Sequence, residues 1–211
     1  MRRTPEARHL HGRATVGRRI AVLALVAGLL AACGSDPTAP APPQTDQTTA
    51  VGDVEPIPQA ALPGRPASPV TLDAGTLASD AVNVSGLQTL LDDAGFVAGT
   101  QRQFSRTQGG RRRIVARVLR FQTPEGAERY LAWLETNVAD VIGKARPNDR
   151  LSAPAGGTVF EHRPNPCCHS ETRVFLAAWN RGSSVVTLQI DGPAARASAV
   201  PELLSQLDAA V

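Results

Sequence analysis

The sequence predicts a single α+β domain, built from a mostly antiparallel sheet of about five strands with two or three packed helices. The predicted elements run in the order helix, two strands, helix, three strands, helix, and short turns join neighbouring strands, which favours antiparallel pairing. All eight aromatic residues lie between Phe96 and Trp179, so the chain has one aromatic core. With 211 residues, 42% of them hydrophobic, the chain can support one such packed domain.

The first predicted helix and hairpin lie between residues 85 and 122. Ser85 can cap a short helix whose leucines follow helical spacing and which ends at Gly95. Strands follow over 96–104 and 112–122 and are joined by a turn at 107–110. In the second strand, alternation places Ile114, Ala116 and Val118 on one face and Arg113, Val115, Arg117, Leu119 and Phe121 on the other. The first face is apolar in its middle, and the second is mixed, which predicts a half-covered surface.

The clearest helix signal spans 124–142. Thr123 is a cap residue, Pro124 stands at the first helical position, and Glu125 places an acid in the first turn. Apolar side chains keep helical spacing along the segment, and Gly143 follows it. This pattern fixes both ends of the predicted helix.

The C-terminal third predicts three strands and a last helix. A short strand is expected over 158–161, and two strands over 172–180 and 184–191 are expected to form a hairpin. Both faces of the first hairpin strand are apolar, which predicts a central position in the sheet. The last helix, over about 199–210, has apolar residues at helical spacing.

Charge and hydropathy divide the chain into a signal peptide over 1–32, a disordered Pro-rich tether over 33–69 and the domain over 70–211. The first part holds six Arg and one Glu, and its residues 20–32 form an apolar run, the pattern of an exported precursor. The tether holds nine Pro and no aromatic residue, so it cannot bury enough apolar area to fold.

The same features exclude two classes of protein. No apolar run reaches the ~18 residues expected of a membrane-spanning helix. Residues 33–211 hold 16 basic and 18 acidic residues, so the excess positive charge lies in the signal peptide. This distribution excludes a basic nucleic-acid binder.

The apolar run ends in Leu30, Ala31, Ala32 and Cys33. This order resembles the lipobox of bacterial lipoproteins, in which a large aliphatic residue, two small residues and a Cys are read by the lipidation enzymes. The resemblance implies that the Cys33 thiol receives a diacylglyceryl group and that signal peptidase II then cuts before it, exposing an amine that can also be acylated. Ordinary secretion is the alternative. Paired arginines before the run leave twin-arginine and general secretory export both open.

A lipidated Cys, a Pro-rich tether and a small α+β domain are similar in layout to many cell-envelope lipoproteins of high-GC Gram-positive bacteria. Lys144 is the only Lys, a bias consistent with that resemblance. The resemblance implies a protein anchored by lipid at the cell membrane, on its extracytoplasmic face. The expected partners are the membrane, reached through the diacylglyceryl group on Cys33, and an envelope protein or ligand. No cofactor is expected.

The most unusual local sequence is the run Pro-Asn-Pro-Cys-Cys-His that ends at His169. With Cys33 lipidated, Cys167 and Cys168 are the only two free thiols, and export places them in an oxidising compartment. A vicinal disulfide is the first interpretation. Three others stay open: a metal site that also uses His169 and His162, free thiols or a disulfide to a partner, and a Cys–His nucleophile pair. Adjacent cysteines disfavour a metal site, because structural zinc ligands are usually two to four residues apart.

Arginines cluster around the first predicted hairpin. The candidates for contact with an anionic partner are Arg111, Arg112, Arg113, Arg117 and Arg120. The alternative is a solvated hairpin whose edge arginines oppose strand-to-strand aggregation. Residues 70–211 hold 15 basic and 14 acidic residues, and this balance favours the alternative.

The sequence contains none of the standard nucleophile-elbow, P-loop, zinc-protease or dinucleotide motifs. We therefore expect a non-enzymatic domain that binds a ligand or partner in the envelope, on its sheet face or in a helix–sheet cleft. The alternative is an envelope redox or hydrolytic enzyme that acts through Cys167, Cys168 and His169.

Overall fold

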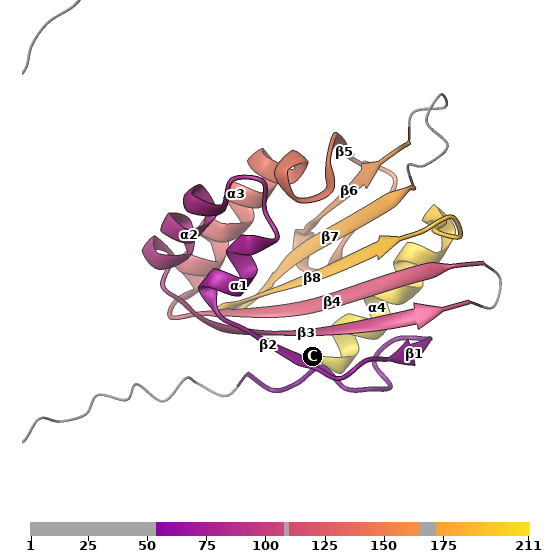
Figure 1. The fold of residues 1–211 in the computed structure, drawn as a ribbon, viewed down its shortest axis with the longest axis horizontal. Coiled ribbons are helices and arrows are strands. Elements are labelled where there is room, and N and C mark those ends of the chain that lie inside the picture. The colour runs from indigo at the N-terminus through magenta and orange to yellow at the C-terminus, as the bar shows by residue number, and fades with distance from the viewer. Residues whose placement is uncertain (1–53, 108–109, 165–171) are drawn as a thin grey trace, which may run out of the picture. The chain divides into compact units, whose positions relative to one another are not determined.

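The computed structural model describes residues 54–107, 110–164 and 172–211, and these ranges contain one antiparallel sheet. The strands pair in the order β1-β3-β4-β8-β7-β6-β5, and β2 also pairs with β3 (Figure 1). Their bounds are β1 Arg65–Pro66, β2 Val70–Leu72, β3 Phe96–Arg106, β4 Arg112–Phe121, β5 Ala145–Pro147, β6 Thr158–His162, β7 Val174–Arg181 and β8 Ser184–Asp191.

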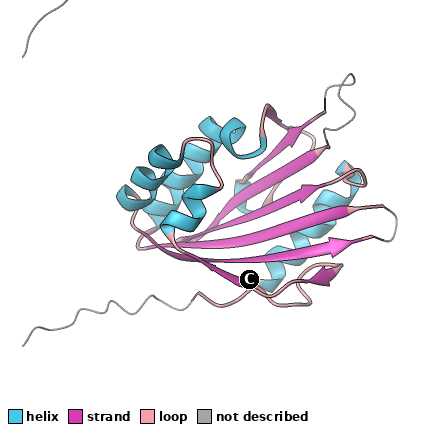
Figure 2. Cartoon of the chain, in the orientation of Figure 1, coloured by secondary structure: helices cyan, strands magenta, loops and turns pink. Residues whose placement is uncertain are grey.

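The helices of the described ranges are α1 Ala74–Ser79, α2 Val84–Asp93, α3 Pro124–Ile142 and α4 Val200–Ala210. The predicted α+β class is confirmed, with eight strands where about five were expected and four helices where two or three were expected. Figure 2 shows the helices and strands separately coloured, with α1, α2 and α3 gathered at one end of the sheet and α4 passing behind the strands.

The folded part begins earlier than the predicted boundary at residue 70. Ile57 is 1% exposed in the core, and Leu62 packs in the same cluster. The strand β1 pairs with β3, with Arg65 opposite Ser105. Residues 54–69 belong to the predicted tether, which holds nine Pro and no aromatic residue, but a few apolar side chains and an edge pairing suffice to pack them onto the domain. The rest of the predicted tether and the signal peptide lie outside the described residues.

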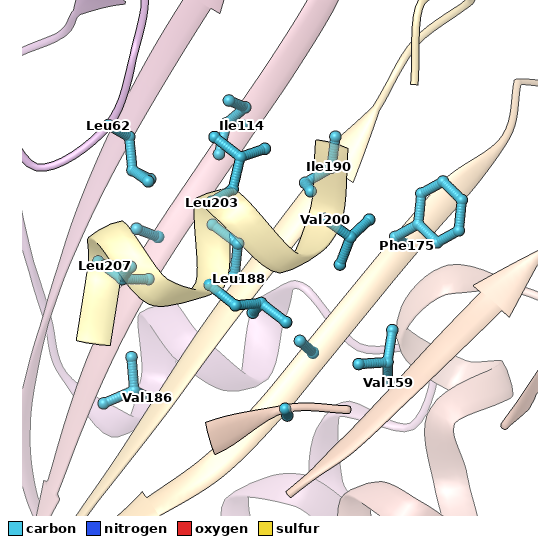
Figure 3. Packing of buried hydrophobic residues seen from close by; sticks show 14 of the residues in the cluster. Leu62, Ile114, Val159, Phe175, Val186, Leu188, Ile190, Val200, Leu203 and Leu207 are labelled. Atoms are coloured by element: carbon cyan, nitrogen blue, oxygen red, sulfur yellow. The ribbon is translucent and has the colours of Figure 1, made fainter. Parts of the chain in front are cut away.

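One face of the sheet packs against α4, and we call it the α4 face. It consists of inward residues from β3, β4, β6, β7 and β8, including Ile114, Phe175, Trp179 and Leu188, which contact apolar side chains of the helix. Figure 3 shows Val200, Leu203 and Leu207 of α4 directed at these strands. The apolar residues of α4 recur at helical spacing, as the sequence predicted, and this spacing places them on the side of the helix that packs against the sheet.

The opposite face, which we call the α3 face, packs against α1, α2 and α3. Leu119 and Phe121 of β4 and Val185 of β8 meet the buried side chains of the three helices. Tyr130 of α3 lies on this core, with its ring 5.6 Å from that of Phe121. The strand β4 alternates between the two faces as predicted, so its apolar residues contribute to both cores.

The helix ends follow local side-chain chemistry. Thr123 caps α3 through a hydrogen bond from the Gly126 N–H to its hydroxyl at 3.2 Å, and Gly143 follows the helix with φ 78°, both as predicted. For α2 the expected cap was wrong: Asn83 rather than Ser85 accepts the Gly86 N–H, at 3.0 Å. An Asn two residues earlier offers an oxygen at the same turn, which lengthens the helix at its start.

Across the described ranges, none of the helices combines the length and the apolar character that crossing a membrane would take.

Candidate functional site

Most of the predicted thiol and imidazole sites lie outside the described residues: Cys33, Cys167, Cys168 and His169 belong to segments that the structure does not describe. His162 ends β6, and its Nδ1 lies 3.1 Å from the Lys144 carbonyl oxygen. Within the described ranges, no group of three or more His, Cys, Asp and Glu side chains could hold a metal ion. The thiol hypotheses therefore stay predictions.

The five candidate arginines do not form one surface. Arg113 and Arg117 point to the α3 face, whereas strand alternation places Arg112 and Arg120 on the other side, and Arg111 is exposed before the strand begins. Arg112 is half-buried, and this burial lowers the pKa of its guanidinium. The sequence cluster is thus split by the pleat of β4.

Arg113 and Arg117 line a polar cavity of about 280 Å³ on the α3 face, which we call the recess. Its floor is formed by β3, β4 and β8, and its wall by residues at the ends of α1 and α3. The complete lining is Asp80, Gln101, Gln103, Arg113, Val115, Arg117, Val141 and Gln189.

The register of β3, β4 and β8 places the residues of the floor side by side. Gln101 lies opposite Arg117, and Gln103 lies opposite Val115, which in turn lies opposite Gln189 of β8. Along β4, this face is apolar and covered at Leu119 and becomes polar at the next inward residue, Arg117. The recess therefore begins where the helical cover ends, about 7 Å further along the strand.

Arg117 is held in one orientation by two partners. Its Nε donates to Gln101 Oε1 at 2.6 Å, and its Nη2 donates to Asp80 Oδ2 at 2.7 Å. The Arg117 side chain is 15% exposed and that of Asp80 is 54% exposed. Because Asp80 caps the end of α1, this ion pair joins the helix to the sheet across the recess.

Arg113 is held in a similar way at the outer end of the recess. Its Nε lies 2.9 Å from Asp191 Oδ2 and 3.2 Å from Oδ1, and its Nη2 lies 2.8 Å from Oδ2. This hydrogen bonding raises the pKa of the Arg113 guanidinium above its ordinary value. The Gln189 side-chain amide donates to the same carboxylate at 3.3 Å. The lining is thus fixed by its own contacts.

The lining carries two guanidiniums and one carboxylate, and Asp191, which pairs with Arg113 beside the recess, supplies a second carboxylate. Three glutamine amides add both donors and acceptors. The lining residues offer hydrogen-bonding groups and no thiol, hydroxyl, amine or imidazole that could act as a nucleophile beside a base. Such a surface is suited to binding a hydrogen-bonding ligand of little net charge.

Sequence reasoning missed four polar members of this site: Asp80, Gln101, Gln103 and Gln189. The sequence feature that pointed to this site was the mixed face of β4, which predicts a half-covered surface. Arg102 of the neighbouring strand β3 is 5% exposed and donates through Nη1 to the Ala67 carbonyl oxygen at 3.1 Å. Its role is to hold the segment after β1 against β3.

No protein-family model matches the chain, and no curated protein matches it. Among solved structures, the extracellular domain of PknH from Mycobacterium tuberculosis is similar to it, with a TM-score of 0.46 and 12% sequence identity. The similarity covers 69% of this chain and 84% of that domain. The function of the recess is therefore inferred from its own lining.

Proposed function

We propose that the chain is a lipid-anchored protein of a bacterial cell envelope whose domain binds a ligand in the recess without chemical turnover. The lipobox-like sequence that ends at Cys33 supports the anchor, and the polar recess supports the binding function. The 20 residues between Cys33 and Val54 would span at most roughly 70 Å when fully extended, which sets how far from the membrane the domain can reach.

The observation that carries the binding function is the run of polar side chains on one face of adjacent inner strands. Inner strands are flanked on both sides, and their inward residues normally join a core, as Leu119 does here. Arg117 instead remains polar and oriented between Gln101 and Asp80. Half-buried polar groups are costly unless they are paired, and these are paired with one another. Their remaining donors and acceptors line the cavity, which suits recognition better than packing.

The lining indicates the chemical class of the ligand. Amides and guanidiniums bind hydroxyl and amide groups through paired hydrogen bonds, and guanidiniums that are already paired with carboxylates give little preference for a strongly charged molecule. Val115 and Val141 supply a small apolar contact. Soluble peptidoglycan fragments carry both hydroxyl and amide groups, and they are the probe we choose.

The position of binding is tested by nuclear magnetic resonance on the full chain in a neutral detergent. The side-chain amide signals of Gln103 and Gln189, assigned with single Gln-to-Ala variants, should shift when peptidoglycan fragments are added. The signal of Gln206, which lies on α4, should stay in place. Unchanged signals at Gln103 and Gln189, or an equal shift at all three, would overturn the proposed site.

The anchor is tested separately through Cys33→Ala. This variant should lose labelling by radioactive palmitate and should accumulate as an uncut precursor, because only a thiol at this position can carry the diacylglyceryl group. Normal labelling and normal maturation of the variant would contradict lipid anchoring.

A further inference from the structure

A second cavity lies at the β5 edge of the sheet, on the α4 side, and we call it the edge hollow. Its volume is about 590 Å³. It is lined by Lys144, Arg146, Pro147, Asn148, Asp149, Arg150, Glu161 and Arg163. These residues come from β5 and the residue before it, from the loop that follows it, and from the end of β6 and the residue after it.

The pairing of β5 with β6 explains why the cations gather. Arg146 lies directly opposite Glu161, so both side chains stand on the same face of the sheet. Lys144 immediately precedes β5 and Arg163 immediately follows β6, and both line the same hollow. Arg173, just before β7, joins the cluster through an ion pair with Glu161.

Glu161 organises two of the cations. Its side chain is 5% exposed, and its carboxylate accepts from Arg163 Nη2 at 2.9 Å and from Asn148 Nδ2 at 2.8 Å. Arg173 Nε lies 2.9 Å from the other carboxylate oxygen, and its guanidinium lies 5.6 Å from the centre of the Phe175 ring. The hydrogen bond from Arg163 is the main reason that the pKa of Glu161 lies below its usual range. One buried anion thus holds two guanidiniums at the hollow.

Three further cations have no such partner. Within the described ranges, the side chains of Lys144, Arg146 and Arg150 make no hydrogen bond or ion pair, and all three are exposed. These three, with Arg163 and Arg173, give five positive charges against the two of Asp149 and Glu161. The cluster therefore carries +3, whereas the other ten basic and twelve acidic residues of 70–211 give −2.

We propose that the edge hollow binds a phosphate group. Guanidiniums present several N–H donors in a fixed plane that matches phosphate oxygens, and Lys144 adds a point charge. A concave site that concentrates positive charge favours an anion with more than one negative charge over a single carboxylate. The hollow is separate from the recess, so either can fail its test without affecting the other.

The test is calorimetric titration of the full chain, in a neutral detergent and at low salt, with inorganic pyrophosphate. The double variant Lys144→Gln/Arg146→Gln removes two exposed cations that hold no described contact, so the fold should be kept, as thermal unfolding will verify. Its affinity for pyrophosphate should fall at least tenfold. The matched control is Arg106→Gln/Arg111→Gln, which removes the same charge from exposed positions at the β3–β4 hairpin and should leave the affinity within about twofold.

Equal losses in the two double variants would show a general effect of net charge and would overturn the site. A second titration with glycerophosphoglycerol, the headgroup of phosphatidylglycerol without its acyl chains, distinguishes the sources of the phosphate. Binding of the headgroup, lost in Lys144→Gln/Arg146→Gln, supports the site and assigns it to membrane lipid. Binding of pyrophosphate alone supports it and assigns it to a phosphorylated polymer or soluble phosphate. Binding of neither probe overturns the proposal.

Discussion

Asp80 and Arg117 stand 37 residues apart in the chain, yet their carboxylate and guanidinium lie 2.7 Å apart. This ion pair connects the C-terminal cap of α1 to the middle of β4. Because Asp80 is about half exposed, the pair adds little to stability, within about 1 kcal/mol. Its effect is to orient Arg117 toward Gln101 and to fix the shape of the recess.

The core on the α4 face predicts a large loss of stability for Trp179→Phe. The Trp179 ring is fully buried, and its Nε1–H donates to Asp208 Oδ1 at 2.9 Å. The variant loses this hydrogen bond to a charged group and leaves a cavity, so the free energy of unfolding should fall by about 2–3 kcal/mol. Urea unfolding followed by circular dichroism measures it. The half-buried Trp133 is the control, and Trp133→Phe should cost less than about 1 kcal/mol. Equal losses would contradict this packing.

The junction between α2 and α3 predicts that Gly126→Ala is destabilising. A Cβ at Gly126 would overlap the backbone carbonyl oxygen of Ala94, which cannot move without shifting the end of α2. We expect a loss of about 1–3 kcal/mol in urea unfolding. Gly75→Ala in α1 is the matched control, because its new methyl group would meet only Asp73 Oδ1 at 3.5 Å. It should be neutral or slightly stabilising. If Gly126→Ala proved as harmless, the close approach of the two helices would be wrong.

Tyr130 predicts a distinctive titration. It is the only tyrosine in the chain, and burial raises its pKa to about 12, whereas the unfolded value is about 10. The folded state therefore favours the protonated phenol. That stabilisation is complete below about pH 10 and is lost as pH rises through 12. Tyrosinate absorbance should appear near pH 12 in the native protein and near pH 10 in urea. A native titration near pH 10 would show an exposed ring.

Much of the fold was predictable because its signals are local. Thr123, Pro124 and Gly143 mark both ends of α3 within a few residues, and the alternation along 112–122 assigns β4 to both cores. The strands β1, β2 and β5 have two or three residues each, too few for a periodic pattern. They form by pairing with distant strands, and a Pro-rich stretch around Pro66 looks like a tether until that pairing is known.

The recess was less predictable than the fold. Gln101 and Gln189 are 88 positions apart, and they line the same cavity because β4 lies between β3 and β8 in one register. A sequence pattern shows that each strand has a polar face but not which faces coincide. The arginines around β4 are close in sequence, but strand alternation separates Arg112 from Arg113. The charge balance of residues 70–211 favours a solvated hairpin over one basic surface.

The predicted vicinal disulfide between Cys167 and Cys168 lies outside the described residues and has a direct test. If Cys33 is lipidated, these are the only remaining thiols, so the exported protein should show no alkylatable thiol until a reductant is added. A disulfide between adjacent residues closes a loop of almost no length, so its reduction should change the stability of the domain little. Intact-mass analysis with and without alkylation measures it. Two alkylatable thiols in the unreduced protein would favour the metal or reactive-thiol interpretations.

The central claim, that the recess is the ligand-binding site, is tested most directly by the affinity of the full chain for soluble peptidoglycan fragments. The double variant Gln103→Ala/Gln189→Ala removes two amides from the floor, and each lost hydrogen bond should cost about 0.5–1.5 kcal/mol. Calorimetric titration should therefore show binding about tenfold weaker than in the unchanged chain. Gln206→Ala, which removes an exposed amide from α4, should bind as the unchanged chain does. Unchanged affinity in Gln103→Ala/Gln189→Ala would contradict the account.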